Sequence, residues 1–150
     1  MENRLYYWKL ACYETSGNLP KRAIGKSNFI DLSLLPKETM REEYRRYFLY
    51  RGGQVSLNTI CHEKAYYHQV CKALQLRKNI PDSFLGWQPS KWIELLKIWM
   101  LQNGIPLYEE KESVYGTRNR ADAKVIQHLK RFLRFIQPED MRPERDKDIW

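Results

Sequence analysis

The chain has 150 residues, a mass of 18.2 kDa and a formal net charge of +8, with five Trp, ten Tyr and five Phe. A chain of this length can bury a hydrophobic core, and it contains no apolar run of about 18 residues that would span a membrane. A basic surface rich in aromatic side chains makes nucleic acid the first partner to consider and an anionic membrane surface the second.

The N-terminus and the cysteines indicate the cellular compartment. The opening sequence MENRLYYWKL lacks the order of basic region, apolar region and cleavage site that marks a signal peptide. Cys12, Cys61 and Cys71 are far apart and form no CxxC pair, which is typical of reduced thiols that serve in packing. We therefore expect a soluble cytoplasmic protein.

Residues 1–35 show the period of neither a sustained helix nor a regular strand. An aromatic cluster between Leu5 and Tyr13 is followed by residues that interrupt regular structure, namely Gly17, Pro20 and Gly25. We expect an N-terminal extended or β arm here, separate from the helical domain that follows.

A first helix is predicted from about residue 36 to residue 51. Pro36 suits the first turn of a helix, and Gly52-Gly53 is a stop signal. The expected buried stripe has helical spacing and consists of Met40, Tyr44, Tyr47 and Phe48.

A second helix is predicted from Ser56, a favourable N-cap, to about Arg77. One face of it is apolar, and the opposite face carries side chains that can bind bases or phosphates: Asn58, His62, Tyr66, Gln69 and Lys72. An ordinary solvated face would have the same composition, so both interpretations stay open.

A third helix is predicted between Pro89 and the stop signal Asn103-Gly104. Its stripe contains Trp92 and Trp99, and the helix is apolar on nearly every side. It is therefore either central to the core or the bearer of an apolar patch for another domain.

The fourth predicted helix, residues 117–137, has the sharpest separation of faces. Its apolar sector consists of Val125, Leu129, Phe132, Leu133 and Ile136. The polar residues contain a single acid, Asp122, and the candidates for DNA contact are Arg118, Arg120, Lys124, Gln127, Lys130, Arg131 and Arg134. Because solvated helices usually mix Glu with Lys, this excess of one sign favours a surface that contacts phosphates.

The sequence predicts no enzymatic activity for this chain and no cofactor, because no catalytic pair, activated nucleophile or metal-ligand cluster occurs at usable spacing. His128 and Arg131 spell His-x-x-Arg, but no tyrosine follows them, so we interpret the motif as a coincidence. Cys61, His68 and Cys71 share one helix sector, and a single straight helix cannot place three ligands around one zinc ion.

The helical region resembles the N-terminal core-binding domain, SAM-like in fold, of tyrosine recombinases of the phage-integrase family. The resemblance covers roughly residues 30–150 and rests on the segments EEYRRYFLYRGGQVSLNTI, KWIELLKIWMLQNGIPL, VIQHLKRFLRFIQPED and ERDKDIW. It is closest to integrases of mobile elements in Gram-positive anaerobes, which implies a bacterial cytoplasm.

The resemblance implies a mainly α fold in which a four-helix bundle over residues 36–137 is followed by a linker, 138–150, toward a catalytic domain that this chain lacks. In that family the helical domain clamps duplex DNA at the crossover site, and helices matching the second and fourth predicted here contact the DNA. The implied partners are double-stranded DNA and the protein's own C-terminal catalytic domain, with no metal and no membrane. Whether copies of the chain assemble on DNA stays open.

The alternative function is a helical protein-interaction module. In that case the tryptophan-rich third helix would dock a partner protein, and the positive charge would only keep the chain soluble.

Overall fold

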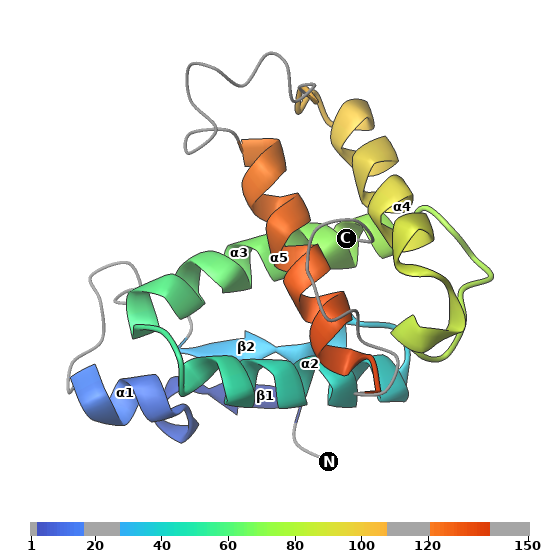
Figure 1. Ribbon diagram of the computed structural model, residues 1–150. Coiled ribbons are helices and arrows are strands. Elements are labelled where there is room, and N and C mark those ends of the chain that lie inside the picture. Colours follow the sequence, from blue (N-terminus) through green and yellow to red (C-terminus); the bar gives the residue numbers. More distant parts are fainter. Residues whose placement is uncertain (1–2, 17–27, 108–120, 139–150) are drawn as a thin grey trace. The chain divides into compact units, whose positions relative to one another are not determined.

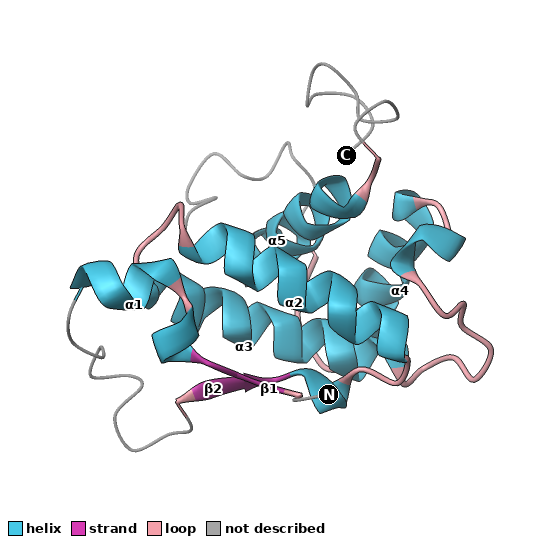
Figure 2. Ribbon diagram, turned by 90° about the horizontal axis from the view of Figure 1, so that it is seen from below, coloured by secondary structure: helices cyan, strands magenta, loops and turns pink. Residues whose placement is uncertain are grey.

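The computed structural model describes residues 3–16, 28–107 and 121–138 (Figure 1). The protein is mainly helical, as the sequence predicted, and it has a small two-stranded antiparallel sheet near the N-terminus (Figure 2). The chain forms two compact units, Met1–Ala65 and Tyr66–Trp150, and the boundary falls within helix α3 (Leu57–Leu74). In the described parts of the chain, no helix is both long enough and apolar enough to cross a membrane.

The first unit contains strands β1 (Arg4–Tyr6) and β2 (Phe29–Asp31), in which Leu5 pairs with Ile30 and Tyr6 with Phe29. Neighbouring residues of a strand point to opposite faces of a sheet. The buried pair Leu5 and Ile30 therefore marks the inner face, and the partly exposed pair Tyr6 and Phe29 marks the outer face. A 3₁₀ turn (Tyr7–Lys9) and helix α1 (Ala11–Ser16) follow β1, and a second 3₁₀ turn (Leu32–Leu34) follows β2.

The described part of residues 1–35 forms core of the first unit, whereas the sequence predicted an arm. The side chains that it buries are Leu5, Tyr7, Leu10, Cys12, Ile30, Leu32 and Leu35. Elements this short show no periodicity, and the burial arises from strand pairing between residues far apart in the sequence. The turn-forming Gly17, Pro20 and Gly25 lie outside the described residues.

Helix α2 (Glu38–Gly52) begins after Lys37, which is its extended N-cap, so Pro36 precedes the helix and does not open it as predicted. The predicted stripe is confirmed, since Met40, Tyr44, Tyr47 and Phe48 are all fully buried. Gly52 is the last helical residue, and a Cβ atom there would lie 3.1 Å from the Cβ of Leu10. A glycine at this position lets the chain around Leu10 approach the helix end closely.

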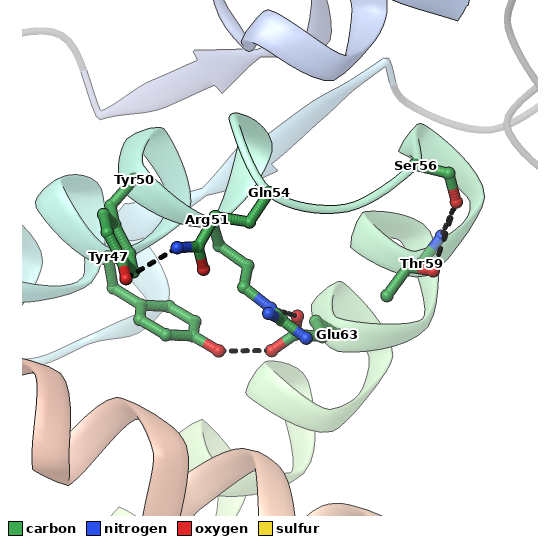
Figure 3. Close-up of polar contacts among 7 residues, drawn as sticks. All are labelled: Tyr47, Tyr50, Arg51, Gln54, Ser56, Thr59 and Glu63. Atoms are coloured by element: carbon green, nitrogen blue, oxygen red, sulfur yellow. Dashed lines mark hydrogen bonds and ion pairs between the residues drawn. The ribbon is translucent and has the colours of Figure 1, made fainter.

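Buried Glu63 joins α2 to the first part of α3 (Figure 3). The Tyr47 hydroxyl donates to one carboxylate oxygen at 2.5 Å, and Arg51 Nε donates to the other at 2.7 Å. The guanidinium balances the buried carboxylate, because a charge removed from water is tolerated only when it is paired. The amide of Thr59 donates to Ser56 Oγ at 3.2 Å, which confirms Ser56 as the N-cap of α3.

The second unit contains the end of α3, helix α4 (Pro89–Gln102) and helix α5 (Ala121–Ile136). Pro89 is the first residue of α4, as predicted, and the helix ends through Gly104 at a φ of 73°. The amide of Ile105 donates to the Met100 carbonyl at 2.9 Å and that of Gly104 to the Leu101 carbonyl at 3.3 Å. This pair of bonds is the Schellman ending of a helix.

Helices α4 and α5 pack against each other and run in opposite directions (Figure 1). The indole N–H of Trp92 donates to the Phe84 carbonyl at 2.8 Å. The Phe84 and Phe132 rings pack edge to face, with their centroids 4.9 Å apart. The buried side chains of the two helices include Trp92, Leu95, Leu96, Met100, Val125, Leu129, Phe132 and Leu133. The apolar sector predicted for α5 is therefore buried in the core of this unit, and that of α4 is buried except for the half-buried Trp99.

Candidate nucleic-acid interface

The outward face of α5 is formed by Lys124, Gln127 and Arg131, which are all exposed. They are three, four and seven positions apart in the sequence, so they lie along one side of the helix. Lys130 and Arg134 are half-buried beside this face. We call these five residues the basic face of α5. Arg118 and Arg120, which were also predicted to contact DNA, lie outside the described residues.

The acid of α5 does not lie on the basic face. Asp122 is only 2% exposed and sits in the first turn, where a carboxylate interacts favourably with the positive end of the helix dipole. The helix sequence contains no other Asp or Glu, so α5 itself places no carboxylate among its exposed cations. The charged side chains that α5 contributes to this face are therefore all positive.

His128 is fully buried, whereas Arg131 is exposed. The two ends of the His-x-x-Arg motif therefore face different environments and do not form a joint site. The His128 ring lies 6.0 Å from that of Tyr66 in α3, so this histidine packs inside the second unit.

The candidate residues of α3 divide between the two compact units. Asn58, exposed, and His62, half-buried, belong to the first unit, whereas Tyr66, Gln69 and Lys72 belong to the same unit as α5. Tyr66 is half-buried against His128, and Lys72 is exposed. Gln69 Oε1 is buried and has no hydrogen-bond partner within the described ranges, which makes it an acceptor that a ligand donor could satisfy.

The two tryptophans of helix α4 differ in exposure. Trp92 is buried and hydrogen-bonded to the backbone, and Trp99 is half-buried. The strongly exposed apolar side chain of this helix is Leu101, at 60%. A single exposed leucine is ordinary for a protein surface.

The cysteines behave as packing residues. Cys12 and Cys71 are buried, Cys61 is half-buried, and all three are free thiols. Burial raises the pKa of the Cys12 thiol, which keeps it protonated and unreactive at neutral pH. Over residues 3–16, 28–107 and 121–138, no group of three or more His, Cys, Asp or Glu side chains could hold a metal ion.

A second cluster, of exposed and partly exposed aromatic side chains, was not predicted as a site from the sequence. Tyr6, Trp8 and Phe29 gather on the outer side of the two-stranded sheet. The aromatic residues near the N-terminus were visible in the sequence, but Phe29 joins them only through the pairing of β2 with β1. Strand pairing over this separation has no local sequence signal.

Comparison with protein-family models, with curated proteins and with solved structures finds no match to this chain.

Proposed function

We propose that this chain is a non-catalytic DNA-binding domain that holds duplex DNA through the basic face of α5. The observation that carries the proposal is the set of exposed cations on this helix, with the helix's own acid buried on the inner side. Phosphates are the partners that such a face attracts most strongly, because each contact releases a condensed counterion from the DNA.

The spacing of the cations suits a phosphate backbone. Lys124 and Arg131 are seven residues apart, which corresponds to a rise of about 10 Å along the helix axis. One DNA strand rises about 3.4 Å along the duplex axis per phosphate, so two side chains about 10 Å apart are far enough apart to reach different phosphates. The two cations could therefore contact separate phosphates of one strand at the same time.

The more specific proposal is that the chain is the core-binding domain of a tyrosine recombinase. It rests on the sequence resemblance and includes the four-helix arrangement expected for that domain. In this proposal a separate catalytic domain cleaves the DNA, and the present chain contributes positioning. The basic face of α5 would contact the backbone, while Gln69 and Lys72 of α3 are the candidates for additional contacts.

The salt dependence of duplex binding tests the role of the basic face. We expect Lys124→Ala combined with Arg131→Ala to make the slope of log affinity against log salt less negative by about 1.8, since each phosphate contact contributes about 0.9. The measurement is fluorescence anisotropy of a labelled random duplex titrated with the 150-residue chain at several salt concentrations.

The matched control is Arg77→Ala combined with Lys97→Ala. These two cations are exposed in the same unit, and their loss changes the net charge by the same amount. The control should leave the slope nearly unchanged, because long-range attraction alone contributes little at physiological salt. Equal changes in slope for the two double variants would contradict the proposal.

The interaction-module alternative predicts a different result. A chain whose charge serves only solubility would show no salt-dependent binding of random duplex in the same titration. Of the tryptophans in the third predicted helix, Trp92 is buried and Trp99 is half-buried.

A further inference from the structure

The outer face of the two-stranded sheet displays a row of aromatic rings. Tyr6 and Trp8 stack with ring centroids 4.3 Å apart and planes inclined by 16°, and Tyr6 lies 5.5 Å from Phe29 on the neighbouring strand. We call Tyr6, Trp8 and Phe29 the aromatic row. The row lies on the face opposite the buried pair Leu5 and Ile30, so it is not part of the core.

The end of the row is open to solvent. Trp8 is 46% exposed although tryptophan is the largest apolar side chain, and leaving this area in water has a free-energy cost. The Tyr6 ring stacks against the Trp8 indole. A ligand with a flat π-face would meet a ring that already packs against a neighbour, which lowers the entropic cost of arranging it.

Positive charge surrounds the row. The Arg4 guanidinium lies 4.7 Å from the centre of the Phe29 ring, and the Lys64 ammonium lies 5.9 Å from the same ring and 5.5 Å from that of Tyr7. These cations come from β1 and from α3, so two elements of the first unit bring them to the row. Rings and cations side by side favour a partner that offers both a π-face and negative charge.

Asp31 is the acidic residue among the described strand residues, and its side chain forms hydrogen bonds within the turn that follows β2. Its Oδ1 accepts a hydrogen bond from the Ser33 amide at 3.0 Å and another from the Ser33 hydroxyl at 2.5 Å. Asp31 thereby caps the 3₁₀ turn that follows β2. Asp31 also lies opposite Arg4 in the register of the two strands, so the described residues place two cations, Arg4 and Lys64, and one acid near the row.

From this geometry we propose that the aromatic row binds unpaired nucleotides of single-stranded nucleic acid. A base stacks on Trp8, and the neighbouring phosphates are attracted by Arg4 and Lys64. Ordered aromatic rings with adjacent cations are the combination by which proteins bind single strands without reading their sequence. Duplex DNA is not the ligand, because its bases are stacked on one another and offer no free π-face. This site belongs to the first unit and is independent of the basic face of α5.

The test separates stacking from charge. The 150-residue chain is titrated into a labelled oligothymidylate and into an abasic strand of equal length, each of about twelve nucleotides, which is within the site size of stacking proteins. We expect tighter binding of the oligothymidylate, and we expect Trp8→Ala to weaken that binding by roughly tenfold while affinity for the abasic strand changes little. Trp8→Phe should restore most of the difference, since it keeps a ring.

Tyr50→Ala is the matched control, because Tyr50 is a similarly exposed aromatic residue of the same unit, at 51%, and lies outside the row. It should bind both strands like the wild-type chain, and equal circular dichroism spectra exclude unfolding as a cause. Equal wild-type affinity for the two strands would overturn the proposal, as would equal losses in Trp8→Ala and Tyr50→Ala. The α5 double variant should retain the preference for oligothymidylate over the abasic strand, so this result is distinguishable from failure of duplex binding.

Discussion

Glu63 is a buried carboxylate whose charge is compensated by neighbouring side chains. Its carboxylate is almost completely removed from water and depends on Tyr47 and Arg51 for compensation. Removal of one partner from a buried charge usually costs more than the pair contributes, because the remaining group lacks solvation. The contribution of Tyr47 can be measured directly.

We expect Tyr47→Phe to lower the free energy of unfolding by about 1.5–3 kcal/mol, the range for hydrogen bonds to charged groups. The substitution keeps the ring in the core and removes only the hydroxyl that donates to Glu63. Urea denaturation followed by circular dichroism measures the change. Tyr50→Phe on the same helix is the control, because Tyr50 is exposed and its hydroxyl accepts a hydrogen bond from the neutral Gln54 amide (Figure 3), and it should cost less than about 0.5 kcal/mol. Similar losses for the two variants would show that Glu63 does not need the Tyr47 hydroxyl.

Tyr7 links stability to alkaline pH. Burial raises the pKa of the Tyr7 hydroxyl, and the neighbouring Cys61 raises it further. The folded chain therefore holds this proton more tightly than the unfolded chain, in which tyrosine titrates near pH 10. The stability that comes from a neutral Tyr7 is fully present below about pH 10 and is lost as the pH rises above it.

We expect the free energy of unfolding to fall more steeply above about pH 10 in the wild-type chain than in Tyr7→Phe, whose ring cannot ionise. Urea titrations at intervals from about pH 8 to about pH 11 give both curves, and the slope is the readout. The raised pKa of Cys12 affects both proteins equally and cancels in the comparison. Parallel curves would mean that Tyr7 does not ionise differently in the folded and unfolded states.

At the scale of elements, the end of a helix depends on the residues next to it. Helix α4 ends through Gly104, whose φ is 73°. This left-handed conformation costs little for glycine, because glycine has no Cβ atom. A Cβ atom at this position would meet nothing within 4 Å, so a substitution here tests the backbone conformation without steric interference.

Gly104→Ala should therefore lower the free energy of unfolding by about 1–2 kcal/mol, the cost of the left-handed conformation for an L-residue. Gly104→Asn should cost less, because asparagine adopts this conformation more readily. Thermal or urea unfolding of both variants provides the comparison. If alanine is tolerated as well as asparagine, the helix does not depend on a left-handed residue for its end.

At the scale of the whole molecule, the net charge of +8 attracts any polyanion, so weak binding at low salt has little diagnostic value. The two proposed surfaces differ in what they add to this attraction. The basic face of α5 adds phosphate contacts in the second unit, whereas the aromatic row adds stacking in the first. Slopes against salt and the difference between thymidylate and abasic strands therefore measure separate properties of one chain.

The sequence alone determined the mainly helical class, the bounds of α4 and the two faces of α5. These features depend on neighbours within about four residues, such as Pro89 at a helix start, Gly104 after a helix end and the apolar spacing from Val125 to Ile136. Local patterns of this kind are readable because helical hydrogen bonds and side-chain contacts are themselves local. The start of α2 was predicted less well, because Pro36 indicated a helix start at residue 36, whereas the helix begins at Glu38.

The tertiary structure decided which polar and aromatic side chains are available. Asp122 and His128 of α5 are buried, although the sequence alone does not distinguish their exposure from that of Lys124. Glu63 is also buried, and its hydrogen-bond partner Tyr47 lies on another helix. Phe29 joins Tyr6 only because two three-residue strands pair across a long separation. Such contacts form between segments that are distant in the sequence. Bringing these segments together costs chain entropy, which is recovered only when the whole unit folds. A short window of sequence therefore cannot predict these contacts.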